Sequence, residues 1–158
     1  STSAAEGARI VLALAFRAGD ALLALAARDI VEVLPRVPLR APSLAPAAVI
    51  GLLPFRGTLT PVVDLTLLVA GRPSARQLGT RIIVVRIGSG ADARLIGLQA
   101  EQVSELIDCE RTAPGLRVPE QRWLGEHLVD QPGLPQLVDP AELLPDALRA
   151  LFTEQADA

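Results

Sequence analysis

The sequence has few of the residues that usually carry catalysis or hold metal ions. Its 158 residues include one histidine, one cysteine and one tryptophan, and aromatic residues make up 3% of the chain. His127 and Cys109 cannot provide the close set of about four ligands that a structural zinc ion requires. Because Cys109 has no second cysteine to pair with, an intramolecular disulfide is excluded and a reducing cytoplasm is the expected compartment. We therefore expect no metal and no cofactor.

The chain also lacks an overall positive charge and any long apolar run. A formal net charge of -3 and a pI near 5.2 give no general field of the kind that attracts phosphate backbones. The few aromatic residues offer no platform for stacked bases. The apolar residues 10–16 are followed by Arg17 and Asp20, so they fit a buried strand better than a membrane span of about 20 residues. We expect neither a nucleic-acid partner nor direct membrane insertion.

The stretch 51–65 places a single Arg-Gly pair between two apolar runs. Phe55 precedes the pair, and β-branched residues are frequent after it. Gly57 can supply the positive φ that a tight turn needs, so the pattern predicts a β-hairpin with Arg56 displayed at its tip. That position suits partner binding, although a solvated arginine beside a structural glycine is the commoner arrangement. Arg56 is thus a candidate for recognition rather than catalysis.

An internal repeat divides the chain into two units. Several apolar blocks recur in the same order, with offsets that grow from 72 to 75 residues. The blocks are 9–14 with 81–86, 22–34 with 95–107, 50–51 with 124–125, and 63–64 with 138–139. Ordered blocks with slowly growing offsets indicate two copies of one supersecondary unit.

Each copy contains short runs rich in Val and Ile that are separated by Gly, Pro and Asp turns. This pattern is typical of small antiparallel β units. The sequence therefore predicts a mainly β fold class, with two similar small β-barrels packed as one domain. The first barrel unit is expected over roughly 9–71 and the second over roughly 81–145. Short helical segments are expected as well, because Asp139 followed by Pro140 predicts a C-terminal helix over 140–153.

The two copies differ at the hairpin. Where the first has Arg56 and Gly57, the second has the turn residues 130–134 without an Arg-Gly pair. Glu32 and Glu105 take equivalent places in the alignment, but only Glu32 has a potential arginine counterpart in its own unit. If neighbouring strands bring Glu32 to Arg56, a bidentate pair would fix the plane of the guanidinium group. The first copy is therefore the specialised one.

Two patterns could indicate catalysis, and both have simpler structural explanations. Residues 88–93, Gly-Ser-Gly-Ala-Asp-Ala, fit a relaxed dinucleotide fingerprint, which needs a helix to open beside the pyrophosphate. The repeat instead aligns them with a short turn at 16–20. Asp64 and Asp139 could form a carboxylate pair, but they hold equivalent places in the two copies and are expected to end strands. We therefore expect a protein that is not an enzyme.

Several motifs resemble those of the CheW-like coupling domains. Residues 53–57, Leu-Pro-Phe-Arg-Gly, and 61–65, Pro-Val-Val-Asp-Leu, resemble the family's Leu-Arg-Gly and Pro-Val-x-Asp-Leu signature. Residues 30–33 are similar to its Val-x-Glu-Val strand, and 103–106 resemble a later strand of the second half. The positions to which the resemblance gives structural roles are Gly51, Pro61, Asp64 and Leu65.

The resemblance implies a single CheW-like domain over 1–158 that acts as a noncatalytic adaptor. In that family the domain couples the cytoplasmic tip of a chemoreceptor, a methyl-accepting protein, to a CheA-type histidine kinase, whose regulatory domain would dock on the first barrel. The residues implied in receptor or partner binding are Arg56, Glu32, Phe55 and Gly57. The adaptor is expected in the cytoplasm, recruited to membrane receptor arrays. Two alternatives stay open: a coupling-like fragment of a larger chemosensory protein, or a dinucleotide-binding enzyme.

Overall fold

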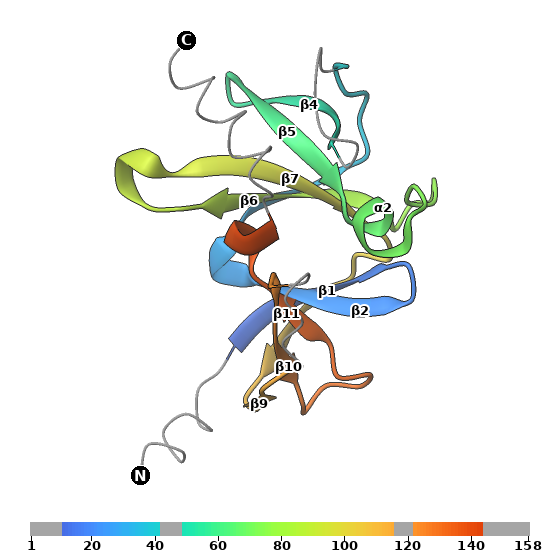
Figure 1. Cartoon of the computed structure of the whole chain (residues 1–158), viewed down its shortest axis with the longest axis vertical. Helices are drawn as coiled ribbons and strands as arrows, with labels where there is room; N and C mark the ends of the chain where they lie inside the picture. Colours follow the sequence, from blue (N-terminus) through green and yellow to red (C-terminus); the bar gives the residue numbers. More distant parts are fainter. Residues whose placement is uncertain (1–10, 42–48, 116–121, 144–158) are drawn as a thin grey trace.

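The computed structural model describes residues 11–41, 49–115 and 122–143, which form a mainly β structure (Figure 1). The strands are β1 (Val11–Ala18), β2 (Ala21–Ala26), β3 (Ile30–Pro35), β4 (Val49–Phe55), β5 (Thr58–Asp64), β6 (Arg81–Ile87), β7 (Arg94–Ala100), β8 (Leu106–Cys109), β9 (Thr112–Ala113), β10 (Leu124–Leu128) and β11 (Gln136–Val138). A short α-helix, α2 (Leu65–Ala70), follows β5, and 3-10 helices cover Ala27–Asp29, Gly90–Asp92 and Pro140–Leu143. No helix in the described ranges is long and apolar enough to cross a membrane. The predicted mainly β fold class is confirmed.

The strands form two mixed sheets that lie one above the other along the long axis (Figure 1). The six-stranded sheet has the order β8-β1-β2-β11-β10-β9, and the five-stranded sheet has the order β3-β6-β7-β5-β4. Neighbouring strands are antiparallel except β2 with β11 and β5 with β7. Each repeat unit has an opening hairpin, β1–β2 or β6–β7, and a closing hairpin, β4–β5 or β10–β11. In each sheet the parallel pair joins the opening hairpin of one unit to the closing hairpin of the other.

Each repeat unit contributes strands to both sheets. The first unit gives β1 and β2 to the six-stranded sheet and β3, β4 and β5 to the five-stranded sheet, and the second unit does the reverse. The two sheets therefore do not coincide with the units 9–71 and 81–145. The reason lies in the short 3-10 helix Ala27–Asp29, which carries the chain from one sheet to the other. A repeat in sequence gives the order of the strands but not their partners.

The strand registers support the equivalence of the two units. In the five-stranded sheet Ile83 of β6 lies opposite Val33 on one side and Leu98 on the other. In the six-stranded sheet Leu14 of β1 lies opposite Leu106 on one side and Leu25 on the other, which is the same arrangement. Glu32 directly precedes Val33, and Glu105 directly precedes its equivalent, Leu106. The two glutamates thus occupy equivalent positions, at the offset of 73 that the sequence predicts.

The same registers correct the alignment of the first block. Leu14 is equivalent to Ile83, an offset of 69 rather than the 72 predicted from residues 9–14 and 81–86. An odd shift turns the opposite face of a strand toward the core. The sequence could not fix this register because both runs are almost continuously apolar. The offset then rises from 69 to 73 between the first and second strands of the units. The loop 88–93 explains this rise, because it has four residues more than the turn of Gly19 and Asp20.

One part of the hydrophobic core lies between the two sheets, and another part is enclosed by the five-stranded sheet alone. The largest cluster lies between the sheets and contains Phe16 and Leu25 from one and Leu98 from the other, each at most 1% exposed. A second cluster lies within the five-stranded sheet, where Leu53 of β4 and Val31 of β3 contact the same buried group. These two strands are the edges of the sheet, so the sheet bends until its edges share one core. Each fully buried aliphatic side chain contributes about 1.5–3 kcal/mol.

The predicted C-terminal helix is described only at its start. The Oδ1 atom of Asp139 accepts a hydrogen bond from the Ala141 N–H at 3.1 Å, and Pro140–Leu143 form a 3-10 helix. The remainder of the predicted helix, from residue 144 to 153, lies outside the described residues. Asp139 therefore caps a helical segment, as the sequence predicts.

The glycine-rich residues 88–93 form the loop between β6 and β7. They include the 3-10 helix Gly90–Asp92, and the element that follows is the strand β7. A dinucleotide fingerprint requires an α-helix at that place, with its N-terminus facing the pyrophosphate. The dinucleotide-binding alternative is therefore wrong for this loop.

Candidate functional site

The predicted hairpin at Arg56 is present, with an unusual backbone at its tip. Phe55 and Thr58 close the turn as the last pair of β4 and β5. Arg56 and Gly57 both have positive φ, 48° and 81°, which is the combination of a type I′ turn. A non-glycine residue in this region costs about 1–2 kcal/mol. The chain thus keeps an exposed arginine where asparagine or glycine would be less strained.

The side chain of Arg56 lies over the ring of Phe55. The Phe55 side chain is only 6% exposed, because it belongs to the core cluster of the five-stranded sheet. The Cζ atom of Arg56 lies 4.8 Å from the centroid of the Phe55 ring, within the range of a cation–π contact. The structure gives the guanidinium no hydrogen bond or ion pair with any described residue. Its N–H donors therefore have no partner among the residues that the structure describes.

Glu32 lies on the same sheet but does not pair with Arg56. It is exposed on β3, at one edge of the five-stranded sheet, whereas Arg56 follows β4 at the other edge. The two ion pairs among the described residues are Arg72 with Glu101 and Arg122 with Glu142. The condition on which the pair was predicted, neighbouring strands, is not met. Phe55 takes the orienting role instead.

Two further motif positions, Gly51 and Pro61, lie on the two strands of the hairpin, β4 and β5. Gly51 is buried, and a Cβ atom there would come 2.5 Å from the Cβ of Leu39. The missing side chain lets the segment before β4 lie against that strand, where Arg40 and Leu52 form a bridge with hydrogen bonds of 2.9 and 2.7 Å. Pro61 is also buried and lies opposite Leu52 in the ladder. Both residues are structural.

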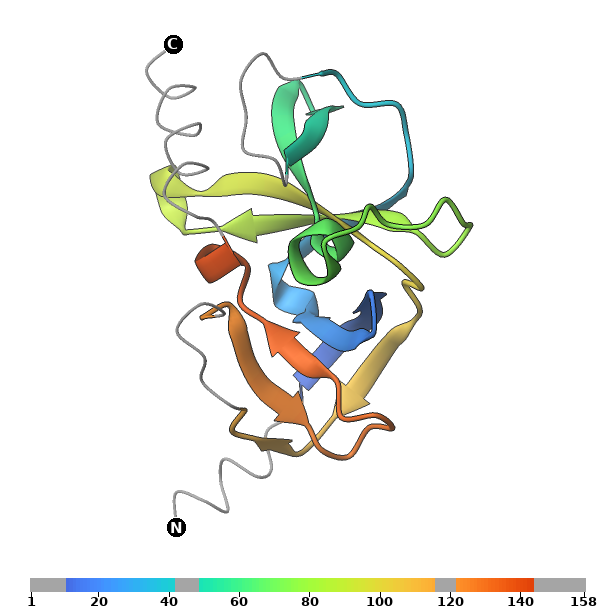
Figure 2. The same cartoon turned by 45° about the vertical axis from the view of Figure 1, so that its right-hand side comes forward.

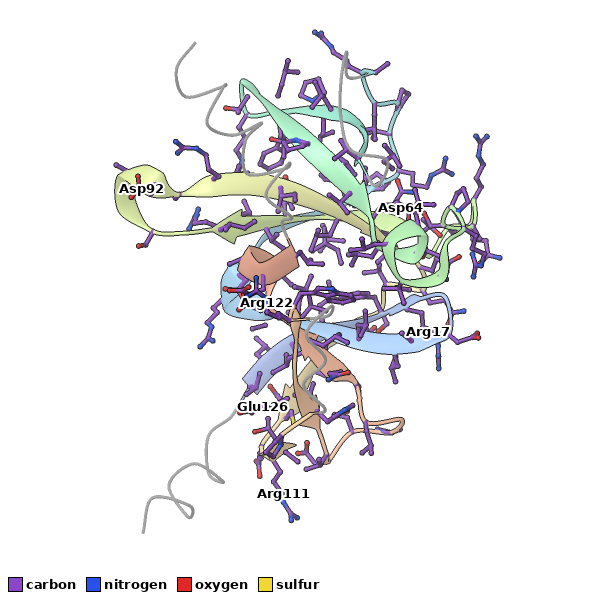
Figure 3. The ribbon with its side chains drawn as sticks, viewed as in Figure 1. Arg17, Asp64, Asp92, Arg111, Arg122 and Glu126 are labelled. Carbon is purple, nitrogen blue, oxygen red and sulfur yellow. The ribbon has the colours of Figure 1, made fainter. Side chains whose placement is uncertain are left out.

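Asp64 caps α2 and also holds the segment that follows the helix. It is 1% exposed, and its Oδ1 accepts from the N–H groups of Thr66 and Leu67 at 3.0 and 3.2 Å. Its Oδ2 accepts from the N–H and the hydroxyl of Ser74, both at 2.9 Å (Asp64 is labelled in Figure 3). The neighbouring Leu65 is fully buried. With every oxygen occupied, Asp64 has a structural role rather than a catalytic one.

Glu101 is a second buried carboxylate, and sequence analysis missed it. It is 7% exposed and accepts from Ala75 N–H at 2.8 Å, Gly19 N–H at 3.3 Å, the Thr66 hydroxyl at 3.2 Å and the guanidinium of Arg72. Burial alone would raise the pKa of Glu101, but these hydrogen bonds outweigh it and hold the pKa below its usual value. The carboxylate joins the hairpin of one sheet to α2 and β7 of the other.

The remaining chemical groups of the described residues have structural partners rather than the arrangement of a catalytic site. Burial and a hydrogen bond to the Asp130 carboxylate raise the pKa of the Cys109 thiol, which makes it a poor nucleophile. The Nδ1 atom of His127 lies 2.9 Å from the carbonyl oxygen of Leu134. Within the described ranges no group of three or more His, Cys, Asp or Glu side chains could hold a metal ion.

A groove of about 400 Å³ lies away from the Arg56 hairpin. Its lining includes Arg17 and Leu22 from the β1–β2 hairpin, Val69 from α2, and Trp123. Figure 3 labels Arg17 in the six-stranded sheet, far from the β4–β5 tip. Arg56 is not part of the lining, so the recognition surface predicted at the hairpin is separate from this groove.

Comparison with known proteins identifies the fold. Residues 12–146 match the model of the CheW-like domain family, which is most of the chain. The chain belongs to the CheW-like family. The crystal structure of the scaffolding protein TtCheW from Thermoanaerobacter tengcongensis is similar, with a TM-score of 0.74 and 20% sequence identity over 87% of this chain and 89% of that chain. No curated protein sequence matches the chain significantly. The chain thus carries a CheW-like domain over most of its length, and that family is noncatalytic.

Proposed function

We propose that this CheW-like domain couples the cytoplasmic tip of a chemoreceptor, a methyl-accepting protein, to a CheA-type histidine kinase. It would act in the cytoplasm as an adaptor that is recruited to membrane receptor arrays. The observation that carries the proposal is Arg56, an exposed arginine on a strained turn whose donors have no partner among the described residues. Strain of this kind is retained mainly where a residue is needed for function.

The hairpin supplies both geometry and chemistry for a receptor contact. Gly57 allows the type I′ turn, and the ring of Phe55 covers one face of the Arg56 guanidinium. The edge of the guanidinium then offers parallel N–H donors, which suit a carboxylate or backbone oxygens on a receptor helix. Glu32, exposed on the same sheet, would make a separate contact. Recognition by a few well-held side chains fits the hot-spot pattern of protein interfaces.

The test is charge reversal at the hairpin. Arg56→Glu should weaken binding of a purified receptor signalling tip at least about tenfold, a change of about 1.4 kcal/mol. Because Arg56 is exposed, the thermal unfolding curve should change little. Arg86→Glu is the matched control, since Arg86 is also exposed and lies at the end of β6. Unchanged receptor affinity in a well-folded Arg56→Glu protein would refute the assignment of this hairpin.

A further inference from the structure

The segment between α2 and β6, residues 71–80, is an exposed loop that two buried carboxylates hold in place. We call it the connecting loop. Asp64 accepts both hydrogen bonds of Ser74 at 2.9 Å. Glu101 accepts the N–H of Ala75 at 2.8 Å and pairs with the guanidinium of Arg72 at 3.3 Å. Figure 2 shows the loop projecting beyond α2. An exposed segment with so much buried polar support is pre-organised.

The second half of the connecting loop is closed by its own hydrogen bonds. The hydroxyl of Thr80 donates to the carbonyl of Ala75, and the Thr80 N–H donates to the carbonyl of Gln77 at 3.0 Å. Gly79 accepts from the N–H of Val103 at 2.8 Å, which ties the loop to the segment after β7. Residues 76–78 are therefore pushed outward. Leu78, at their end, is 97% exposed.

The part of the sequence that contains Leu78 is strongly basic. Between residues 33 and 91 the sequence has seven arginines and a single acidic residue, the buried and fully bonded Asp64. This stretch has a net charge of +6, so the rest of the chain carries -9 to give the total of -3. Arg76 and Arg81 are exposed at the connecting loop and at the start of β6. Neither arginine has an ion pair among the described residues, whereas Arg72 is paired with Glu101. An exposed leucine beside these two arginines fits a partner that is acidic and has an apolar recess.

We propose that the connecting loop docks the histidine kinase, through an acidic surface of the kinase's regulatory domain that receives Leu78 in an apolar recess. This inference rests on the proposed function. An adaptor must hold two partners at once, and the receptor is assigned to the Arg56 hairpin. The strand β5 runs from that hairpin to Asp64, and its seven residues span about 20 Å. The two docking sites lie at opposite ends of one rigid strand, so both partners fit together.

The experiment measures binding of the purified kinase regulatory domain by calorimetry at low and at high salt. Arg76→Glu should weaken the affinity about tenfold at low salt and less at high salt, because screening removes the electrostatic part. Leu78→Ser should weaken it severalfold at both salt concentrations. The matched controls are Arg111→Glu and Leu134→Ser, exposed residues of the β8–β9 connection and of the loop between β10 and β11. Neither control should change the affinity for the kinase domain.

The outcomes separate this inference from the proposed function. If Arg56→Glu abolishes receptor binding while both connecting-loop variants keep normal kinase affinity, the docking site is wrong and the function stands. If the unmodified chain binds neither receptor nor kinase domain, both fall. Vesicles of phosphatidylserine and phosphatidylcholine provide a further arm. Loss of vesicle binding in the loop variants, with kinase affinity unchanged, would assign the loop to a membrane surface and overturn the kinase site.

Discussion

The closing hairpins of the two repeat units have the same place in the fold but opposite surroundings. In the second unit, Asp130 bonds to the Cys109 thiol and to the N–H of Glu110, and Gln131 donates to the carbonyl of Asp108 at 2.8 Å. That hairpin is bonded to its own sheet. In the first unit, Arg56 is exposed, lies over the ring of Phe55 and has no ion pair among the described residues. The second hairpin is thus bonded into the fold, whereas the tip of the first is free for the partner contact proposed above.

The capping aspartates show the same divergence, and removing them gives the largest expected effect. Asp64→Ala should lower the free energy of unfolding by about 3–4 kcal/mol, because it removes a helix cap and leaves the buried donors of Ser74 unpaired. Asp139→Ala should lower it by about 1 kcal/mol, since its bonded N–H is exposed. Urea unfolding followed by circular dichroism measures both. Equal losses would show that the two units have not diverged at their caps.

Glu101 exists in one unit only, and its removal should give the next largest effect. At offset 73 its equivalent is Arg28 in the first unit. Glu101→Gln should cost about 2 kcal/mol near neutral pH, because charge-assisted hydrogen bonds are lost. The pKa of Glu101 is lower in the folded state than in the unfolded chain. Its contribution is therefore complete above the unfolded pKa of about 4.3 and disappears as pH falls through the folded value.

Unfolding curves from neutral pH down to acid pH test this sign. The unmodified chain should lose more stability than Glu101→Gln as the pH falls, so that the difference between them shrinks. A constant difference across the range would mean that the charge of Glu101 is not what stabilises the junction of the two sheets.

The two hairpins also share a strained residue, which gives a smaller effect and a sharper comparison. Arg56 and Leu134 have φ of 48° and 50°. Asparagine tolerates this region better, so Arg56→Asn should raise the free energy of unfolding by about 1 kcal/mol. It should at the same time weaken receptor binding. Leu134→Asn relieves the same strain in the second hairpin and should leave receptor affinity unchanged. Stabilisation without loss of binding at Arg56 would show that the arginine has no receptor role.

The sequence predicts the order of elements better than their partners. The repeat, the Arg56 turn and the aspartate caps follow from local patterns, because glycine, β-branched residues and capping groups act within a few residues. Two features depend on contacts between strands that are distant in the sequence: the division of each unit between the two sheets, and the offset of 69 between Leu14 and Ile83. Continuous apolar runs do not specify such contacts. The docking role proposed for the connecting loop was not predicted, although the charge imbalance between 33–91 and the rest is present in the sequence. The net charge of the whole chain conceals it.

The smallest expected effect is the coupling between Glu32 and Arg56. Glu32 lies on the edge strand β3 and Arg56 follows the other edge strand, β4, and they form no ion pair with each other among the described residues. Glu32→Arg and Arg56→Glu should therefore weaken receptor binding independently, with a coupling free energy below about 0.5 kcal/mol in a double-mutant cycle. Glu105→Arg, at the equivalent position of the second unit, is the control and should leave receptor binding unchanged. If the double reversal restores binding, so that the coupling exceeds about 1 kcal/mol, the receptor must bring the two side chains together. The hairpin would then be completed by its partner rather than by Phe55 alone.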